Sequence, residues 1–583
     1  MMKPNMKFKV AIRILKFFLV AAFPIFSRAQ TALSAAQIIA NKYMTIEKDS
    51  AMVKRQAIAD WNYAQSMVLQ GMIGLWKQTG DGKYFKFIQK DVDLFNKNKR
   101  TNSCGVNHLI PARELLLLFR VTGKKQYLDD IDSAYKKSGL ALSIKKKSAG
   151  GEKGFSKDNL AEKMYIEAPF TVAYARTFHK SALLSNIAGK YLLEAKNIEL
   201  NSYGYSAAGL GLYGMALVDA LDNFPNDQKE KKELALTLKS LAAYVMKMQD
   251  KNSGLWWHKL KVPSQGGNYL DSSASCMFIY TLLKGVRTGV LPASCSDVAQ
   301  KAFKTIRKEF LKKDIINNPE TTGAFLLAAN EIEMLSTLSL GKGNVVLLDY
   351  YFNHETKKDV TGASIPFHYV WKELDNGGYS MFGNIFNKYG LQTKTIERAP
   401  SLQLLKKASI YIIVDPDTKK ETERPNYMGD GDINTIYSWV KSGGILMLFN
   451  NDSGNAEFTH FNKLAEKFGI QFNYDSKNHV LGNQYEMGAI QIDPGNLIFK
   501  SARKVYIKEY SSLAIHSPAA AVLKDGKTIV AAVARIGKGA VFAVGDPWFY
   551  NEYEDGRKIP VEFENYKAAE DLIKWLIYQI NGR

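Results

Sequence analysis

The stretches TGDGKYFKFI, from Thr79 to Ile88, and TGKKQYLDDI, from Thr122 to Ile131, are two copies of one short pattern. In each copy a tyrosine stands four residues after the glycine, and the copies are offset by 43 residues. Each glycine separates two helix-like apolar runs, which is typical of a helix end. Paired helices that repeat about every 40 residues predict a helical solenoid or a closed helical toroid.

The helical pattern extends from about Ser34 to Thr337. Apolar side chains recur there at helical spacing, which predicts buried faces of amphipathic helices. Two such sets are Tyr84, Ile88, Val92 and Phe95, and Leu234, Leu238, Leu241, Val245 and Met248. We therefore expect an all-α domain over residues 30–339, and an (α/α)6 barrel is one arrangement of such helix pairs. The composition does not separate a closed ring from an open one.

The pattern changes after Leu340–Gly343, where short apolar runs begin to alternate with helix-like segments. NVVLLDYYF, from Asn344, and SIYIIVDPD, from Ser409, are typical buried strands. Strand–helix alternation predicts a flavodoxin-like, doubly wound α/β domain over residues 344–583, with antiparallel strands near its end. Four aspartates follow predicted strands, where they are either solvated or near a ligand site. They are Asp349, Asp415, Asp417 and Asp546.

The N-terminal residues have the pattern of a secretory signal peptide. A basic segment precedes the apolar run Phe17–Phe26, and Ser27-Arg28-Ala29 is a small-x-small cleavage site. The apolar run is too short to span a bilayer. We therefore expect residues 1–29 to be removed and the mature protein to be secreted or periplasmic, without stable membrane insertion.

The net charge of the 583-residue chain is +21, and +15 remains without the six basic side chains of residues 1–29. For an exported protein this favours an acidic polysaccharide over nucleic acid as partner, although a basic surface without a specific partner is an equal alternative. The three cysteines, Cys104, Cys276 and Cys295, form no metal-binding spacing. We expect neither a metal nor a cofactor, and nothing indicates an oligomeric state.

The segment GLWWHKLKVPSQGGNYLDSSASCMFIYTLLKGVRTGVL, Gly254–Leu291, is the most informative about function. Aromatic faces suit the apolar faces of sugar rings, and Trp256 and Trp257 are adjacent here. A carboxylate close to them, such as Asp271, is suited to acid/base chemistry or to hydrogen bonding with a sugar. We expect one tryptophan to form part of a sugar site and the other to lie in the core.

Several segments together carry a resemblance to a known family. They are MYIEAPF (Met164–Phe170), MALVDALDNFP (Met215–Pro225), GAFLLAANEIE (Gly323–Glu333) and the segment Gly254–Leu291. With these motifs the chain resembles the unsaturated glucuronyl and rhamnogalacturonyl hydrolases, which are glycoside hydrolase families 88 and 105. The resemblance implies an (α/α)6 barrel that removes a 4,5-unsaturated uronic acid from oligosaccharides by hydrating its vinyl ether.

The resemblance also implies site residues. The family's key aspartate stands three residues before the motif tyrosine, Tyr165, and Glu162 occupies this position. Glu162 is therefore the candidate acid/base, and its alternative role is that of a first-turn helix residue stabilised by the helix dipole. Glu167, in the same motif, is a second candidate. Tyr63 and Trp61 are further candidate site aromatics.

Other family positions are altered. Asn107–Arg113 stands where the family has two acidic residues, and His108 and Arg113 are the candidate substrate contacts that remain. Asn268 and Tyr269 match the family, and Asp271 replaces a glutamate; Asp271 is a substrate contact or a helix N-cap. The glycine-rich segment Ser206–Leu212 lacks the family's tryptophan, arginine and asparagine.

The C-terminal region resembles the glutamine-amidotransferase-like modules appended to bacterial carbohydrate enzymes, but it contains no cysteine to serve as their nucleophile. We expect an accessory domain. The main expectation for the whole chain is an exported unsaturated-uronyl hydrolase. The alternative is a catalytically degenerate or altered relative that binds carbohydrate. A sugar epimerase is a weaker third hypothesis, because the histidines are scattered.

Overall fold

The computed structural model describes residues 23–49, 62–97, 105–140, 157–200, 205–225, 229–312 and 318–582. Most of the predicted signal peptide, together with Trp61 and Cys104, lies outside these residues. The chain divides into two compact units. Within the described ranges no helix is both long enough and apolar enough to cross a membrane.

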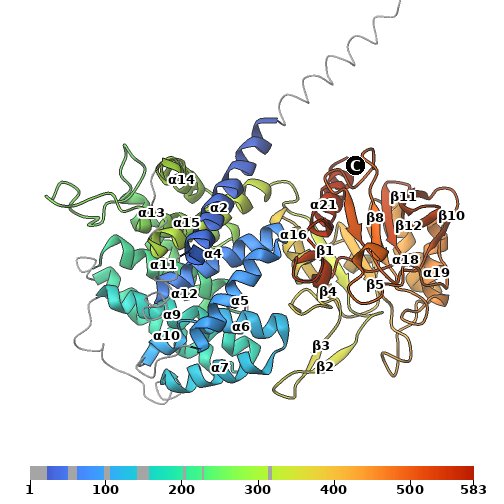
Figure 1. Cartoon of the computed structure of the whole chain (residues 1–583), viewed down its shortest axis with the longest axis horizontal. Coiled ribbons are helices and arrows are strands. Elements are labelled where there is room, and N and C mark those ends of the chain that lie inside the picture. Colours follow the sequence, from blue (N-terminus) through green and yellow to red (C-terminus); the bar gives the residue numbers. More distant parts are fainter. Residues whose placement is uncertain are drawn as a thin grey trace, which may run out of the picture. The chain divides into compact units, whose positions relative to one another are not determined.

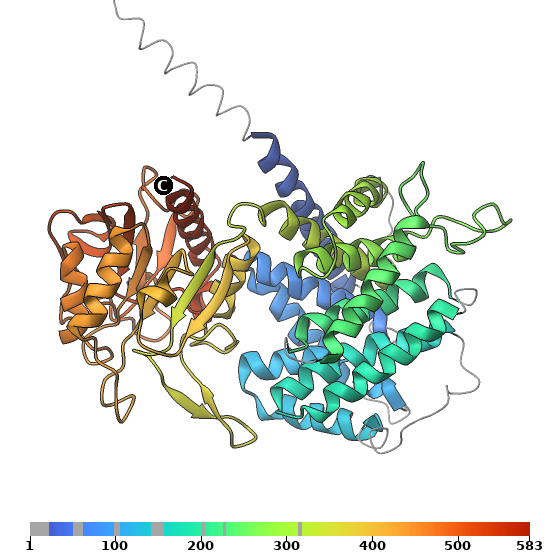
Figure 2. The same ribbon diagram turned by 180° about the vertical axis from the view of Figure 1, so that it is seen from behind.

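The first unit is helical, and its helices form an inner and an outer set (Figures 1 and 2). The inner helices are α4 (Tyr63–Thr79), α6 (Ala112–Thr122), α9 (Lys157–Thr177), α11 (Ala207–Asn223), α13 (Ser272–Arg287) and α15 (Pro319–Thr337). The outer helices are α2 (Phe23–Asp49), α5 (Gly82–Lys97), α7 (Lys125–Lys137), α10 (Ala182–Leu200), α12 (Lys229–Lys247) and α14 (Ser294–Lys312). The two sets alternate along the chain, as the repeat predicts.

The six inner helices form a closed ring. Helices α9, α11, α13 and α15 pack side by side in chain order. From α4, Ser66 Oγ donates to Glu114 Oε1 of α6 at 2.7 Å, and Arg113 of α6 lies over the Tyr165 ring of α9. Asn330 Nδ2 of α15 donates to the carbonyl of Gly71 in α4 at 2.8 Å and closes the ring. The arrangement is therefore a closed toroid of paired helices.

Small residues allow α4 and α15 to approach closely at this closure. A Cβ added to Gly323 would lie 2.6 Å from the Val68 backbone nitrogen, and one added to Gly71 would lie 2.5 Å from Leu326 Cβ. Such distances are shorter than any normal contact between non-bonded atoms. The close approach places the first turns of α4 and α15 beside each other.

The second unit contains a nine-stranded mixed sheet in the order β4-β1-β5-β6-β13-β12-β10-β7, with β11 paired to β12. The strands are β1 (Val345–Asp349), β4 (Gln392–Ile396), β5 (Ile410–Val414), β6 (Ile445–Phe449), β7 (Ile470–Phe472), β10 (Leu513–Ile515), β11 (Ala520–Asp525), β12 (Thr528–Ile536) and β13 (Gly539–Val544). Strands β4, β1, β5, β6 and β13 are parallel, and the others pair antiparallel. Turns at Asp525-Gly526 and Gly537–Gly539 join β11 to β12 and β12 to β13, so the antiparallel strands expected near the end of the domain are confirmed.

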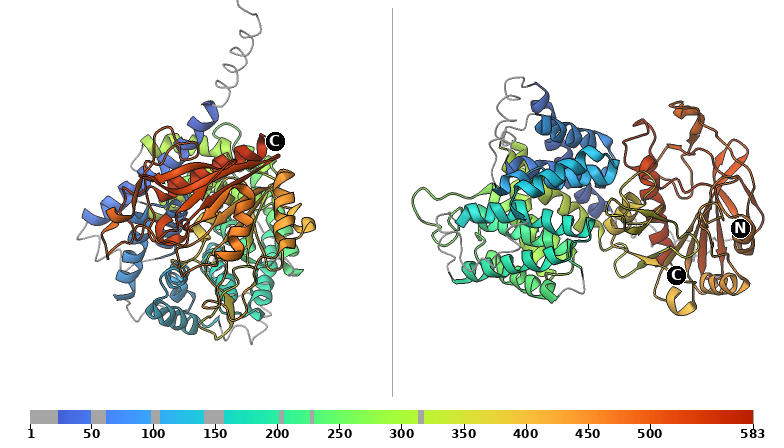
Figure 3. Two further views of the ribbon diagram at one scale, coloured as in Figure 1. Left: turned by 90° about the vertical axis from the view of Figure 1, so that its right-hand side faces the viewer. Right: turned by 90° about the horizontal axis from the view of Figure 1, so that it is seen from below.

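Helices cover both faces of this twisted sheet, as the left view of Figure 3 shows. On one face, α18 (Asp430–Lys441) and α19 (Thr459–Ala465) contribute to a core with alternate side chains of β5 and β6. On the other face lie α16 (Ser380–Lys388) and α21 (Asn565–Asn581). Residues buried on both faces explain why β5, β6 and β13 are continuous apolar runs in the sequence, whereas the edge strand β4 is polar.

Two short segments, Trp76–Lys86 and Leu118–Lys124, belong to the second unit although they are distant in sequence from its strands. Each contains one of the repeated Thr-Gly pairs. Gly80 and Gly123 have φ angles of +62° and +66°, the left-handed conformation in which glycine commonly ends a helix. The helix ends predicted from the repeat are therefore confirmed.

Candidate active site at one end of the helical ring

Side chains from the N-terminal turns of several inner helices meet at one end of the ring. Tyr63 is the first residue of α4, Ser273 and Glu320 are second in α13 and α15, and Glu162 lies in the second turn of α9. Glu162, Glu320 and Tyr63 are half-buried, so these groups remain accessible to a ligand.

Glu320 is held by two hydroxyl donors. Ser273 Oγ donates to Glu320 Oε1 at 2.5 Å, and the Tyr63 hydroxyl donates to Glu320 Oε2. The pKa of Glu162 is raised, first by burial and then by the negative charge of Glu320. Burial and the same carboxylate also raise the pKa of Tyr63, so its hydroxyl keeps its proton. The site thus contains two carboxyl groups in different electrostatic settings, a recurrent arrangement for acid/base chemistry.

Aromatic rings connect this pair to the interior of the toroid. The Tyr63 and Tyr165 rings meet edge to face with centroids 6.3 Å apart. The guanidinium of Arg113 lies 5.8 Å from the centroid of the Tyr165 ring. Tyr165 is fully enclosed, so it forms the wall below the carboxyl pair.

An ion-pair cluster around Asp219 lies below this wall. Arg113 Nη2 and Lys284 Nζ each lie 2.8 Å from an Asp219 carboxylate oxygen, and the Tyr280 hydroxyl donates to it at 2.5 Å. Burial alone would raise the pKa of Asp219, but Lys284 and Arg113 outweigh burial and lower it to about 2. Arg113, a predicted substrate contact, therefore uses its charge to neutralise a buried aspartate.

The loop before α13 places a second polar group beside the carboxyl pair. His258 Nδ1 lies 2.9 Å from Asp271 Oδ2 and 3.2 Å from the Tyr269 hydroxyl, and the two rings stack at 4.9 Å. Burial, then the charge of Asp271 and then the charge of Glu320 raise the pKa of Tyr269. Tyr269 therefore lies close enough to both carboxylates to be affected by their charges. Tyr269 is 54% exposed, which leaves one ring face open to a sugar.

Asp271 is a helix N-cap, one of the two roles left open by the sequence, and its role as a substrate contact stays a prediction. Its Oδ1 accepts from the Ala274 backbone nitrogen at 2.9 Å and caps α13, whereas Oδ2 faces His258. Asn268 has a structural position, because its side chain binds the backbone of Lys259 and Val262. It therefore shapes the loop that carries Tyr269.

Neither tryptophan forms part of this end of the ring. Trp256 is completely enclosed, and its Nε1 donates to the carbonyl of Val245 at 2.7 Å. Trp257 is half-buried and, after Ser253, is among the donors that lower the pKa of Asp250. The structure thus places Trp256 in the core and directs the indole N–H of Trp257 toward the end of α12.

Two predicted residues remain, His108 and Glu167. His108 is half-buried in the short helix η1 (Gly105–Leu109), which packs on α9. Glu167 is buried and paired with Lys190 of α10, so it faces the outer helices. Glu162, which stands just before the family motif, is close enough to Glu320 for that negative charge, after burial, to raise its pKa.

Glu320, Ser273 and His258 were not predicted as site residues. Glu320 follows Pro319 in the first turn of α15, and a glutamate there is expected simply from the helix dipole. The GAFLLAANEIE motif lies a few residues later in α15 and is the only signal in the sequence that points to this helix. No local pattern indicates that Tyr63 and Ser273 converge on Glu320.

Elsewhere, the four strand-end aspartates are buried instead of solvated, with exposures of 2% for Asp349, 4% for Asp415, 1% for Asp417 and 3% for Asp546. Asp349 accepts from Tyr411 and from backbone nitrogens, and burial raises the pKa of Asp415 to about 8. Across the described ranges, no group of three or more His, Cys, Asp or Glu side chains is placed to hold a metal ion.

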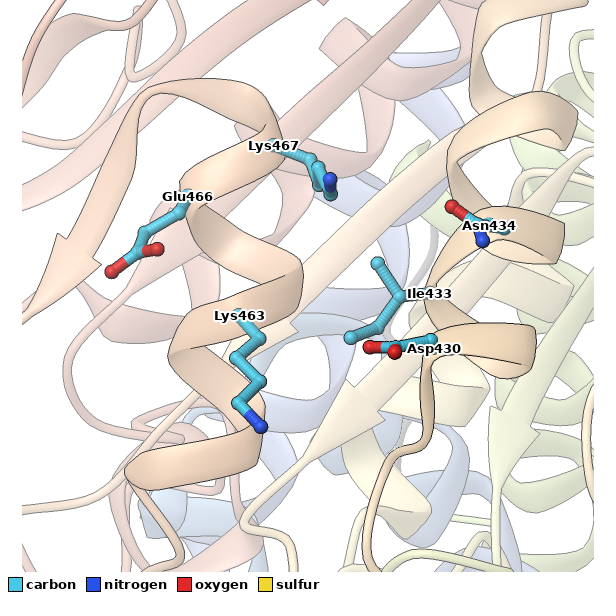
Figure 4. Close-up of a pocket in the computed structure, with 6 residues that line it drawn as sticks. All are labelled: Asp430, Ile433, Asn434, Lys463, Glu466 and Lys467. Carbon is cyan, nitrogen blue, oxygen red and sulfur yellow. The ribbon is translucent and has the colours of Figure 1, made fainter.

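A separate open pocket lies between α18 and α19 in the second unit (Figure 4). Its lining residues are Asp430, Ile433, Asn434, Lys463, Glu466 and Lys467. The charged side chains carry both signs and extend from two exposed helix surfaces, as Figure 4 shows. The pocket has no enclosed polar group to orient a ligand, in contrast to the Glu162–Glu320 site.

Known proteins resemble the helical region. The model of Glycosyl Hydrolase Family 88 matches residues 36–205 and 205–320. Protein Atu3128 from Agrobacterium fabrum is 38% identical to this chain over 85 residues. The matched residues are 15% of this chain and 36% of that protein.

Two solved structures are similar to about half of the chain. One is a glycoside hydrolase from family 105 of C. acetobutylicum ATCC 824, which has 24% sequence identity and a TM-score of 0.42. The match covers 50% of this chain and 99% of that chain. A family 88 glycosyl hydrolase from Bacteroides vulgatus has 15% identity and a TM-score of 0.41, with coverages of 52% and 98%. The model of Glycosyl Hydrolase Family 88 thus matches most of the helical region, which is just under half of the chain.

Proposed function

We propose that the protein is a glycoside hydrolase that removes a terminal 4,5-unsaturated uronic acid from oligosaccharides produced by polysaccharide lyases. The observation that carries the proposal is Glu162, at the family's acid/base position, half-buried beside Glu320 with a raised pKa. An acid whose pKa lies nearer to neutral pH both holds its proton and transfers it readily.

In this reaction Glu162 protonates C4 of the vinyl ether, and positive charge develops at C5 and the ring oxygen. Water bonds to C5 and its proton returns to the Glu162 carboxylate. The resulting hemiketal at C5 opens to a ketone, and the hemiacetal that forms at C1 releases the aglycone. Each turnover therefore consumes one water and leaves Glu162 protonated again.

The surroundings of Glu162 support this sequence of steps. Glu320 carries negative charge beside the developing positive charge, and the Tyr63 hydroxyl remains protonated. The exposed ring of Tyr269, backed by His258, offers an apolar face to a sugar. One end of the ring thus combines a proton donor, a negative charge and a stacking surface.

The test measures ultraviolet absorbance of unsaturated oligosaccharides, because hydration destroys their conjugated double bond. Pectic and glycosaminoglycan lyase products are incubated with the wild-type protein and with Glu162→Gln. We expect absorbance to fall with the wild type, and the variant to lose at least about 100-fold in kcat.

Two further variants make the assignment specific. Glu167→Gln removes the other motif carboxylate, which pairs with Lys190, and should keep kcat within a few-fold. Glu233→Gln changes an exposed glutamate on α12 and controls for the substitution itself. Equal loss in Glu162→Gln and Glu167→Gln would contradict the assignment of Glu162 as the acid.

A carbohydrate-binding protein without activity is the second candidate, and the ion pair of Arg113 with Asp219 favours it. This pair leaves Arg113 without a free charge for a uronate carboxylate. Binding of the same oligosaccharides by calorimetry, with no absorbance change on any substrate, would support this candidate over the hydrolase.

We also infer an accessory role for the second unit and export of the chain. When the five parallel strands are numbered along the chain, their order across the sheet is 2-1-3-4-5. This is the flavodoxin-like order and supports that fold. Export rests on the pattern of residues 1–29, and mass spectrometry of the protein secreted by its host would test cleavage before Gln30.

A further inference from the structure

We propose that Glu320 is the second carboxylate of this site and a positioning residue that keeps Glu162 in its proton-donating form. The inference rests on the proposed function and extends it. It concerns a residue that lies outside the family motifs in this sequence. Its basis is the convergence of α4, α9, α13 and α15 at one end of the ring.

Two hydrogen bonds hold the side chain of Glu320 in place. Ser273 Oγ reaches Oε1 at 2.5 Å and the Tyr63 hydroxyl reaches Oε2, so each carboxylate oxygen accepts one bond from a hydroxyl. Bonds donated to a carboxylate stabilise its charge. The Tyr63 hydroxyl stays protonated, because burial and the charge of Glu320 raise its pKa.

Glu162 has the opposite setting. Burial and the charge of Glu320 both disfavour its ionisation, and both raise its pKa. When two carboxyl groups share a site and only one is provided with donors, the other retains the proton. The roles follow: Glu320, held by two hydroxyl donors, is the partner carboxylate, and Glu162 is the acid.

The other charged or titratable groups around the pair do not reverse this assignment. Tyr165 on α9 and Tyr269 before α13 have raised pKa values and remain neutral. Asp271 adds negative charge and faces His258 at 2.9 Å. Arg113 on α6, the nearby cation, is paired with Asp219 at 2.8 Å.

This arrangement accounts for the altered segment Asn107–Arg113. The segment contains no acidic residue, and a carboxylate enters from the first turn of α15 instead. The closure of α4 against α15 brings it into place, since the Asn330 and Gly323 contacts put Tyr63 next to Glu320. The second carboxylate of this site thus comes from α15, and the acid comes from α9.

The first measurement is the pH dependence of kcat/KM. Glu162 must be protonated to act, so activity falls as pH rises through its pKa. Glu320→Gln removes the neighbouring charge and lowers the pKa of Glu162. The high-pH limb of the profile, where activity falls, should therefore move to lower pH by roughly one unit. Glu320→Asp keeps the charge and should retain much of the wild-type position.

Ser273→Ala provides a second variant that leaves the carboxylate in place. Loss of one of the two hydroxyl donors leaves the carboxylate of Glu320 less firmly held beside Glu162, so the high-pH fall of the profile should move in the same direction by a smaller amount. This variant keeps the test informative if Glu320→Gln does not fold. A loss of activity in these variants without movement of the limb would assign Glu320 a merely structural role and overturn the proposal.

A readout without turnover separates this inference from the proposed function. Infrared difference spectroscopy across a pH titration detects the carboxyl band of Glu162, assigned by its absence in Glu162→Gln. Glu320→Gln should lower the pH at which this band disappears. An unchanged titration would refute the role of Glu320 even in an active enzyme, and a shifted titration in an inactive protein would refute only the hydrolase.

Discussion

Glu162 and Asp349 are both carboxyl groups in which burial works against ionisation, but their surroundings differ. Glu162 is half-buried with a like charge beside it. Asp349 ends β1 with 2% exposure, and it accepts bonds from the Tyr411 hydroxyl at 2.8 Å and the Phe352 nitrogen at 2.7 Å. Burial outweighs these bonds and raises the pKa of Asp349 to about 7.

This shift predicts a pH-dependent stability. The folded pKa of Asp349 lies above its unfolded value of 3.8, so the folded state binds the proton more tightly. Its contribution is therefore greatest at low pH and is lost as pH rises from about 4 to 7. Asp349→Asn removes this titrating group, so the unfolding free energy of the variant should change by about 3 kcal/mol less than that of the wild type between pH 4 and pH 7.

Urea unfolding followed at pH 5 and pH 7.5 measures the effect. The wild type should show a steeper loss of unfolding free energy toward pH 7.5 than the variant. Equal slopes for the two proteins would show that Asp349 is ionised throughout this range.

At the scale of single residues, the sequence identified Glu162 and Tyr165 because a motif marks their positions. It did not identify Glu320, Ser273 or His258, because their roles arise from contacts between separate helices. Asp271 shows the intermediate case. Its place before Ser272 predicted an N-cap, and only the structure shows that its second oxygen faces His258.

At the scale of elements, the contact between α4 and α15 carries the active-site geometry. A Cβ on Gly323 would meet the Val68 backbone nitrogen at 2.6 Å, and backbone atoms there cannot move without displacing α4. We expect Gly323→Ala to destabilise the protein by about 1–3 kcal/mol. It should also lower kcat, since Tyr63 and Glu320 would separate.

Gly189→Ala is the matched control. Gly189 lies in α10, is exposed, and a Cβ there meets no atom within 4 Å. The higher helix propensity of alanine should stabilise this helix by about 0.5–1 kcal/mol. Thermal unfolding of both variants compares them directly, and similar effects would show that the close approach is not essential.

The helix ends and strand turns were predictable because they depend on local conformation. Gly80, Gly123 and Gly526 mark them, all with positive φ. Which strands lie next to each other in the sheet was less predictable from the sequence. The last hairpin is antiparallel as expected, but β13 lies parallel beside β6, which joins it to the parallel part of the sheet.

For the whole molecule, the charge of +21 is the main physical property that the sequence states directly. A strongly basic chain attracts polyanions, and salt screens this attraction. We expect retention on immobilised polygalacturonate in about 0.02 M salt and elution before about 0.5 M. Glu162→Gln should elute with the wild type, because the interaction belongs to the whole surface. Flow-through at low salt would contradict this expectation.

The sequence by itself determined several helix ends and strand turns, the alternation of helix pairs and the position of Glu162. These features depend on local backbone preferences, on the spacing of apolar residues and on motifs read along the chain. Only the tertiary structure decided that the six inner helices close into a ring, that Trp256 lies in the core, and that Glu320 is the partner of Glu162. Such contacts depend on which helix faces pack together, and that is a property of the complete fold, because no single segment contains both partners.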